Sequence, residues 1–438
     1  DKNLVDSEVM LGLLTKNGYT LTDDETQADV IVINTCCFIH DAKEESINTI
    51  LEMAQYKEQN LKALVVAGCL AERYKDEILK EIPEIDAVLG TTSYDSIVEA
   101  VNMALAENAG EHFEHYESID YLPDNSEVER VVTTGNHMAY LKIAEGCDKR
   151  CSYCIIPKIR GHFRSVPMEE LLNEAKRLAS EGVKELVLVA QETTLYGKDL
   201  TGEKQLPLLL HELCKIEGIE WIRLLYCYPE EITDELIEAI KTEEKVCNYI
   251  DMPIQHSENR ILQRMGRRTS REDLVAVIKK LRQEIPDITI RTTLITGFPG
   301  ESEEDHEGLM NFVEECKFDR LGVFTYSPEE DTLAATFEDQ IDEEVKEARR
   351  DELMSLQQEI SYEHTQQLVG KTIKVMVEGY LFEDDIYVGR SYMDAPKVDG
   401  CVFINSPEEL MTGDFVYVKI TQGREYDVIG EVDYEFTK

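Results

Sequence analysis

The sequence predicts an α/β protein in three parts: a parallel α/β domain over residues 1–105, a partial (β/α)6 barrel over 135–369, and a small antiparallel β-barrel over 370–438. Helical and buried-strand patterns alternate as far as residue 369, which favours parallel sheets covered by helices. After that point the pattern changes to short strands, typical of a small closed sheet. The length of 438 residues agrees with about three domains.

In the first domain, two apolar runs end at cysteines. The run DVIVIN leads to Thr35-Cys36, and ALVVA leads to Gly68-Cys69. Such runs are typical of strands buried in a parallel sheet, whose first strand we expect before Asp1. The predicted elements are a helix over Val5–Thr15, a strand over Asp29–Asn34, a helix over Ala42–Gln55 and a strand over Ala63–Ala67. The polar, acidic stretch 106–134 is predicted to be a linker.

In the second part, six strand patterns occur, and all but the last precede a helical pattern such as Met168–Glu181 or Glu303–Cys316. Six units rather than eight predict an incomplete barrel. The strands are expected at Tyr140–Ala144, Glu185–Ala190, Trp221–Tyr226, Tyr249–Met252, Thr289–Thr296 and Leu321–Thr325. A long helix over Glu343–Val369 then leads to strands at Ile373–Val377, Ile386–Val388, Val402–Ile404, Phe415–Ile420 and Val428–Val432.

The formal net charge of −44 is spread over the chain as −19 in residues 1–134, −18 in 135–369 and −7 in 370–438. None of these segments has the basic footprint of a nucleic-acid module, so the charge favours a basic protein partner. Without an apolar run long enough for a span or a signal-peptide pattern, we expect a cytoplasmic protein with no membrane partner. Eleven cysteines in such a chain indicate metal or redox chemistry.

Cys147, Cys151 and Cys154 form a C-x3-C-x2-C loop directly after a predicted strand. Three thiolates in one loop can each bind one iron of a 4Fe–4S cluster and leave the fourth iron open to a small molecule. Two alternatives are a zinc knuckle, which requires a fourth ligand that is missing nearby, and three unrelated buried cysteines.

This loop, after the first strand of a partial barrel, resembles that of the radical S-adenosylmethionine superfamily. The segment ITGFPGE, at the end of the fifth barrel strand, resembles the stretch that contacts adenosine in that superfamily. Alone, the segment is equally typical of an ordinary turn. The resemblance implies that S-adenosylmethionine is bound by Ile295, Gly297, Gly300 and Glu301.

Cys36 and Cys69 follow the ends of the two amino-terminal strands, which predicts that both face one crevice. The alternative interpretation is that they are small thiols buried at the strand ends. The segments Lys2–Glu8, Asn34–Cys36 and Gly68–Cys69 resemble those of the methylthiotransferases. That family carries a second 4Fe–4S cluster on three cysteines. The resemblance implies that Cys36, Cys69 and a cysteine immediately before Asp1 hold it.

The chain resembles, over essentially its whole length, the branch that modifies an aspartate of small-subunit ribosomal protein twelve. The specific signs are Lys2–Glu8, Cys154–Pro157 and Gly389–Gly400. The final barrel looks like a TRAM domain, usually an RNA-binding module, but its charge of −7 favours docking of a basic protein. The alternatives are the branch that modifies a transfer-RNA adenosine and a two-cluster electron carrier.

The resemblance implies radical methylthiolation of the aspartate β-carbon to give 3-methylthioaspartate. S-adenosylmethionine would supply both the radical and the methyl group, while an electron donor and a sulfur source would assist. RNA contact would be secondary, through the arginines between Arg260 and Arg271. Polar residues at predicted strand ends are candidates for contact with cofactor or substrate, with ordinary structural roles as the alternative: Gln191, Asp251, His256 and Arg291.

Overall fold

The computed structural model describes residues 1–75, 77–106 and 112–435. The described chain folds into two compact units. Unit 1 comprises residues 1–133, 142–173 and 327–335, and unit 2 comprises 134–141, 174–326 and 336–438. Residues 107–111 of the predicted linker lie outside the described residues.

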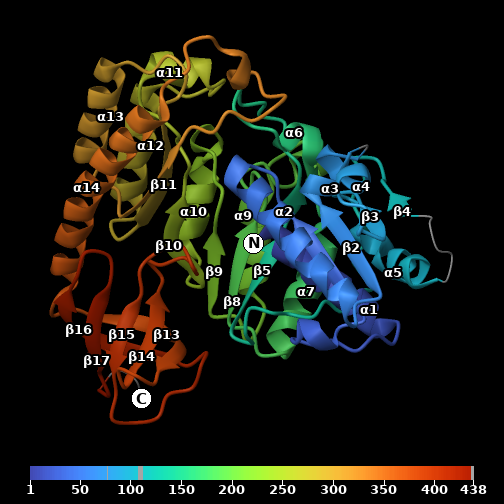
Figure 1. The fold of residues 1–438 in the computed structure, drawn as a ribbon. Coiled ribbons are helices and arrows are strands. Elements are labelled where there is room, and N and C mark those ends of the chain that lie inside the picture. The colour runs from blue at the N-terminus through green and yellow to red at the C-terminus, as the bar shows by residue number, and fades with distance from the viewer. Residues whose placement is uncertain (76, 107–111, 436–438) are drawn as a thin grey trace. The chain divides into compact units, whose positions relative to one another are not determined.

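Unit 1 contains a parallel four-stranded sheet in the order β1-β2-β3-β4 (Figure 1). Alternate residues of β2 face opposite sides, so Leu64 and Val66 join one apolar cluster while Val65 and Ala67 join another. Helices cover both faces, which explains why β2 is apolar throughout. The strands are β1 (Val30–Thr35), β2 (Ala63–Gly68), β3 (Ala87–Leu89) and β4 (Phe113–His115), and the helices are α1 (Lys2–Lys16), α2 (His40–Ala54), α3 (Cys69–Arg73), α4 (Ile78–Glu81) and α5 (Ile97–Leu105).

The edge strand β4 lies within residues 106–134, which the sequence predicts to be a linker. It pairs with β3 in parallel, with Ala87 opposite Phe113 and Leu89 opposite His115. Its three residues contain a single large apolar side chain, so the sequence has no buried run at this position. Pairing with β3, rather than a local pattern, therefore makes this segment a strand.

Unit 2 contains a six-stranded sheet in the order β12-β11-β10-β9-β8-β5, which confirms the partial barrel. The described pairs from β8 to β12 are parallel. The strands are β5 (Met138–Lys142), β8 (Glu185–Val189), β9 (Trp221–Leu224), β10 (Val246–Asp251), β11 (Thr289–Thr296) and β12 (Arg320–Thr325). The accompanying helices are α7 (Met168–Ser180), α8 (Lys198–Thr201), α9 (Leu206–Cys214), α10 (Asp234–Thr242), α11 (Asn259–Arg264), α12 (Arg271–Glu284) and α13 (Glu303–Cys316).

The carboxy-terminal strands form a closed barrel in the order β13-β14-β15-β17-β16 around a core of valines and isoleucines. One pair differs from the predicted antiparallel arrangement, because β15 and β17 run parallel. The long helix α14 (Glu343–Leu368) packs against β12 and β16 and so joins the two sheets of unit 2. The barrel strands are β13 (Thr372–Leu381), β14 (Ile386–Ser391), β15 (Val402–Asn405), β16 (Phe415–Gly423) and β17 (Val428–Val432).

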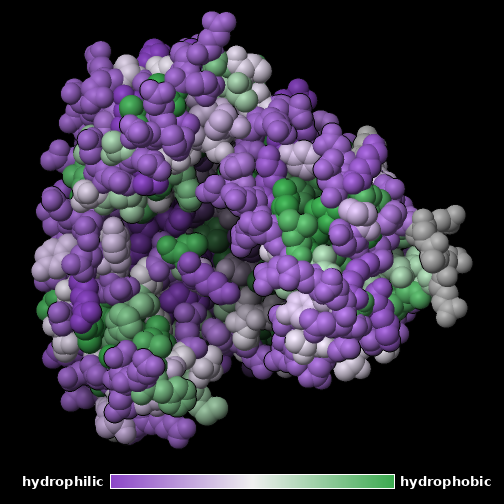
Figure 2. Space-filling model, viewed as in Figure 1, coloured by the Kyte–Doolittle hydropathy of each residue, from purple (hydrophilic) through white to green (hydrophobic). Residues whose placement is uncertain are grey.

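The face shown in Figure 2 is mainly hydrophilic, as a chain with 31% charged residues implies. In the part of the chain that the structure describes, no helix combines the length and apolar character needed to cross a membrane.

Candidate functional site

Cys36 and Cys69 lie next to each other in the sheet of unit 1. The strands β1 and β2 are parallel, and Thr35 is paired with Gly68, so the two cysteines follow equivalent positions at the carboxyl edge. Ser46 fixes the backbone of Cys36, since its hydroxyl accepts from the Cys36 N–H at 3.0 Å and donates to the Cys36 carbonyl at 2.9 Å. The structure therefore brings these two predicted residues together.

The neighbouring thiols differ in their surroundings. Cys37 is completely buried, and burial together with Cys69 raises the pKa of its thiol to about 12, although Arg73 acts in the opposite direction. Burial also raises the pKa of Cys69, whereas Arg160 counteracts it through its charge and a hydrogen bond. Each of the two thiols therefore has an arginine that opposes the effect of burial on its pKa.

The second cysteine group lies in a loop of unit 1 that begins after the short strand β6 (Ala144–Glu145), which pairs with β7 (Arg164–Ser165). The Cys147 N–H donates to the Gly161 carbonyl at 3.1 Å, and the Cys154 N–H donates to the Cys151 carbonyl at 3.0 Å. Cys147 and Cys151 are buried, and Cys154 is half-buried. The helix α6 (Ile156–Ile159) follows the loop.

The loop is held by a close backbone approach at Gly146. Its φ of +79° lies in the left-handed region. A Cβ at this position would lie 2.7 Å from the Gly161 carbonyl oxygen and closer still to that of His162. Glycine is thus required immediately before Cys147.

The thiols suit an iron–sulfur cluster by their chemistry, because cysteine thiolates are its usual ligands. Cys147, Cys151 and Cys154 lie within a single loop. Among the described residues, however, no three cysteine, histidine, aspartate or glutamate side chains are already gathered closely enough to hold a metal ion. The three thiols thus fit a cluster by their chemistry, although the described side chains do not converge on one point.

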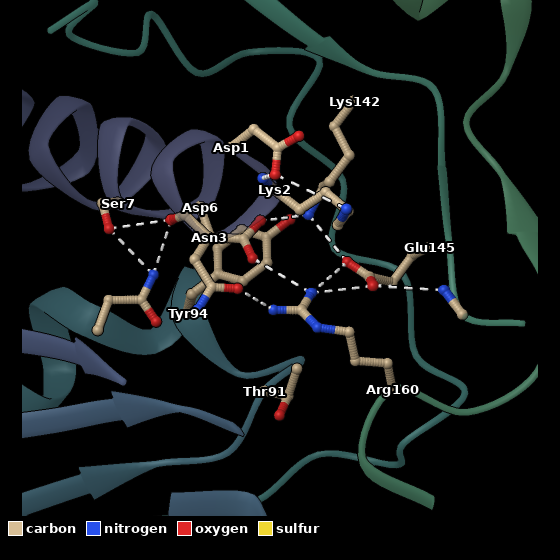
Figure 3. Close-up of polar contacts among 12 residues, drawn as sticks. Asp1, Lys2, Asn3, Asp6, Ser7, Thr91, Tyr94, Lys142, Glu145 and Arg160 are labelled. Atoms are coloured by element: carbon tan, nitrogen blue, oxygen red, sulfur yellow. Dashed lines mark hydrogen bonds and ion pairs between the residues drawn. The ribbon is translucent and has the colours of Figure 1, made fainter. Parts of the chain in front are cut away.

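A buried ion network lies in the same unit, formed by Asp6, Lys142, Glu145 and Arg160 (Figure 3). Lys142 donates to Asp6 and, at 3.0 Å, to Glu145. Arg160 donates to both carboxylate oxygens of Glu145 at 2.9 Å and lies 3.6 Å from Asp6. Two acids and two bases leave the network neutral, which is how charges this deeply buried are tolerated.

The network joins α1 to the loop that carries Cys147. Arg160 also donates to the side chain of Asn3 on α1 (Figure 3). The Asn3 amide in turn donates to the Thr35 carbonyl at 3.1 Å. Burial acts to raise the pKa of Glu145, but Arg160 and Lys142 outweigh it, so the carboxylate stays ionised. Sequence reasoning missed the network, although a lysine inside the apolar strand YLKIA was an available signal.

In unit 2, Glu301 holds the glycine-rich turn that follows β11. The Gly297 N–H donates to Glu301 at 3.0 Å, Arg349 donates to it at 2.8 Å, and His256 lies 3.3 Å away. Burial acts to raise the pKa of Glu301, but these three partners lower it overall. Gly297 has a φ of +67°, and a Cβ there would meet the Lys346 side chain, so the turn admits no larger residue.

The other candidates separate into two environments. Arg291 donates to Asp251 at 2.8 Å and lies 3.3 Å from Asp399, so these residues form one cluster. His256 is completely buried and belongs instead with Glu301. Gln191 is half-buried and lies two residues after the end of β8.

The arginines considered for RNA contact have acidic partners. Arg260 pairs with Asp305, Arg264 with Asp339, and Arg271 with Glu258. Arg267 stacks on the Tyr228 ring at 4.4 Å. These contacts reduce the positive potential that the sequence cluster suggested.

The six-stranded partial barrel, the C-x3-C-x2-C loop and the glycine-rich turn together define a radical S-adenosylmethionine protein. Family comparison agrees, because residues 141–313 match the Radical SAM superfamily. Residues 1–90 match Uncharacterized protein family UPF0004, and residues 369–432 match the TRAM domain.

The full chain is also similar to curated proteins. It is 62% identical over 434 residues to ribosomal protein uS12 methylthiotransferase RimO of Lachnoclostridium phytofermentans, covering 99% of this chain and 98% of that protein. It is 52% identical to the RimO protein of Acetivibrio thermocellus, covering 100% and 97%. The chain belongs to the ribosomal protein uS12 methylthiotransferase family. This confirms the family and enzyme class identified by resemblance and does not favour the transfer-RNA branch or an electron carrier.

A solved structure shares the fold. The radical S-adenosylmethionine methyltransferase TsrM from Kitasatospora setae, with cobalamin and a [4Fe-4S] cluster bound, superimposes with a TM-score of 0.57 at 14% identity. The match covers 84% of this chain and 76% of that protein. The similarity supports the α/β fold class.

Proposed function

We propose that this protein transfers a methylthio group to the β-carbon of an aspartate in ribosomal protein uS12, giving 3-methylthioaspartate. The observation that carries the proposal is 62% identity over nearly the full length of a relative named for methylthiolation of uS12. The net charge of −44 supports a basic ribosomal protein as substrate, since opposite charge accelerates encounter.

Cys147, Cys151 and Cys154 are proposed to hold the 4Fe–4S cluster that binds S-adenosylmethionine. When bound, this cofactor pair supplies a 5′-deoxyadenosyl radical able to remove hydrogen from an unactivated carbon. Gly146 fixes the backbone before the first ligand, and the contacts of Glu301 hold the glycine-rich turn rigid. Ile295, Gly297, Gly300 and Glu301 are the residues proposed to bind the adenosine side of the cofactor.

A second 4Fe–4S cluster is proposed on Cys36, Cys69 and a cysteine directly before Asp1. The adjacent strand ends support the first two ligands.

Four strand-end residues are proposed to contact cofactor or substrate: Gln191, Asp251, His256 and Arg291. Arg291 has the chemistry to bind a carboxylate, such as that of the target aspartate. It already contacts Asp251 and Asp399, so a substrate carboxylate would have to replace one of them. His256 acts more indirectly, by supporting Glu301.

The remaining proposals concern partners and location. An electron donor and a sulfur source are required, and RNA contact is secondary because the cluster of arginines is largely paired. The carboxy-terminal barrel is proposed to dock the basic substrate. A location in the cytoplasm is proposed because the proposed substrate is a ribosomal protein.

The test is anaerobic reconstitution of the protein, extended to include the preceding cysteine, with iron and sulfide. It is incubated with reductant, S-adenosylmethionine, and either uS12 or transfer RNA. Mass spectrometry should detect one methylthio group on an aspartate of uS12. Modification of the RNA alone would contradict the proposal.

A further inference from the structure

The segment between β14 and β15 carries two buried aspartates that face arginines of the six-stranded sheet. Asp394 pairs with Arg320, the first residue of β12. Asp399 lies 3.3 Å from the Nε of Arg291 on β11. The two aspartate side chains are only 5% and 2% exposed. The carboxy-terminal barrel thus places two fixed carboxylates against the partial barrel.

The guanidinium of Arg291 is fixed on two sides. Its Nη1 donates to Asp251 at 2.8 Å, while its Nε faces Asp399. Asp399 is itself held in place, since its carboxylate accepts from the Tyr249 hydroxyl at 2.6 Å and from the Ala395 N–H at 2.8 Å. These contacts give the guanidinium one orientation and so fix where its remaining nitrogen, Nη2, is directed.

Nη2 of Arg291 lies beside a glycine of the neighbouring strand. Among the described residues, the hydrogen bonds and ion pairs of Arg291 use Nη1 and Nε, so the two N–H groups of Nη2 are unused. A Cβ at Gly322 would be 3.7 Å from Nη2. Apart from the chain neighbours of Gly322, the only other described atom within 4 Å of that Cβ belongs to the Phe324 ring, also at 3.7 Å. Nη2 therefore faces a position that holds no side chain, the open position.

The backbone does not require glycine at Gly322, because its φ lies outside the left-handed region. A glycine within a strand often marks a place where a ligand or another backbone comes close. In the described sheet β12 is an edge strand, and Phe324 on the same face is 54% exposed, so this face is accessible. Because two carboxylates already contact Arg291, a neutral acceptor suits Nη2 better than a third anion.

We propose that Asp399 is a positioning residue for substrate binding: it holds Arg291 so that Nη2 donates to a backbone carbonyl oxygen of the substrate protein at the open position beside Gly322. The inference rests on the proposed function, which makes uS12 the substrate. One hydrogen bond to Nη2 leaves the contacts with Asp251 and Asp399 in place, and the Phe324 ring can pack against the same segment. Asp399 thus connects the carboxy-terminal barrel to substrate binding in the partial barrel.

The test compares steady-state kinetics of the full-length protein, extended to include the preceding cysteine and reconstituted, with uS12 and S-adenosylmethionine each varied in turn. Asp399→Asn removes the charge that faces Arg291 and keeps the shape of the side chain. Asp394→Asn is the matched control, because it changes a similarly buried acid of the same segment that contacts Arg320 instead. Gly322→Val removes no contact of Arg291 and fills the open position with methyl groups.

Asp399→Asn and Gly322→Val are expected to raise the KM for uS12 about tenfold, as for the loss of one hydrogen bond to a charged group. The KM for S-adenosylmethionine and the kcat at saturating uS12 should stay the same, because the lost contact binds substrate and transition state alike. Asp394→Asn should leave the KM for uS12 unchanged. Since Gly322→Val introduces a strand-favouring residue without a clash, its thermal unfolding should match that of the parent, which separates lost binding from lost folding.

A uS12 variant with the target aspartate replaced by asparagine serves as a competitive inhibitor and identifies the group that Arg291 binds. Its inhibition constant should rise in Asp399→Asn by the same factor as the KM for uS12, because its backbone carbonyl is unchanged. An inhibition constant that is equal for the parent and Asp399→Asn would overturn the inference and assign the target carboxylate to Arg291.

Equal increases of the KM for uS12 in Asp394→Asn and Asp399→Asn would overturn the positioning role, since both changes would then act through the fold. An unchanged KM for uS12 in Gly322→Val would also overturn the inference, because no substrate atom would occupy the open position. A rise in the KM for S-adenosylmethionine alone would assign the position to the cofactor and overturn it as well. Failure of the parent to methylthiolate uS12 would instead contradict the proposed function.

Discussion

Replacing Gly146 by alanine is expected to unfold the loop that carries Cys147. A non-glycine residue at a φ of +79° costs about 1–2 kcal/mol. The added Cβ would lie 2.7 Å from the Gly161 oxygen, where real Cβ atoms essentially never come within 3.0 Å, and the His162 oxygen is closer still. Both atoms are backbone, so relief requires the chain to move, at about 1–3 kcal/mol for overpacking.

The expected loss in the free energy of unfolding is therefore about 2–5 kcal/mol, measured by guanidinium titration. Cluster content, read from iron analysis after reconstitution, should fall with it. Gly18→Ala is the matched control, since Gly18 has a φ of +90° but nothing within 4 Å of the added Cβ. It should lose only the ~1–2 kcal/mol due to φ and keep its iron. Equal stability and equal iron in the two variants would refute the reasoning.

Three further outcomes are expected. Cys151→Ala should abolish formation of 5′-deoxyadenosine, measured by chromatography, whereas Cys69→Ala should spare it and abolish thiolation; unimpaired thiolation without Cys69 would count against the second cluster. The pKa of Glu185 is lowered to about 2, since Arg390 and Arg223 outweigh burial. Because this value lies below the ordinary 4.5, about 3 kcal/mol of stability is present above pH 4.5 and disappears as the pH falls to about 2. Glu185→Gln should remove this acid sensitivity. At neutral pH it should also destabilise the protein by about 3–5 kcal/mol, because it leaves two buried arginines without their carboxylate. Acid titrations of unfolding that coincide for the two proteins would contradict this account.

Elements with strong local patterns could be predicted from the sequence. The predicted helix Glu303–Cys316 has the same bounds in the structure, where a capping box between Ser302 and Asp305 starts it. The buried strand at Ala63–Ala67 extends by one residue to Gly68. In both cases, the residues that define the element are neighbours in the chain, so local physics is sufficient.

Features that depend on distant residues could not be predicted. The strand β4 exists because β3 offers it a free edge, and β17 runs parallel to β15 because the barrel must close. Aspartate and arginine usually lie at the protein surface, so their residue types do not mark Asp6 and Arg160 as buried. Both can be buried because the fold gives them partners of opposite charge that are distant in the sequence. The cysteine spacing was visible in the sequence, whereas the buried partners of Arg160 required the folded chain.

The most direct test of the central claim is isotope transfer from the substrate. Ribosomal protein uS12 carrying deuterium at the aspartate β-carbon is incubated with the reconstituted enzyme, reductant and S-adenosylmethionine, and the 5′-deoxyadenosine is analysed by mass spectrometry. We expect deuterium in the 5′-deoxyadenosine together with methylthiolated uS12. Methylthiolated uS12 accompanied only by unlabelled 5′-deoxyadenosine would contradict hydrogen removal from that carbon.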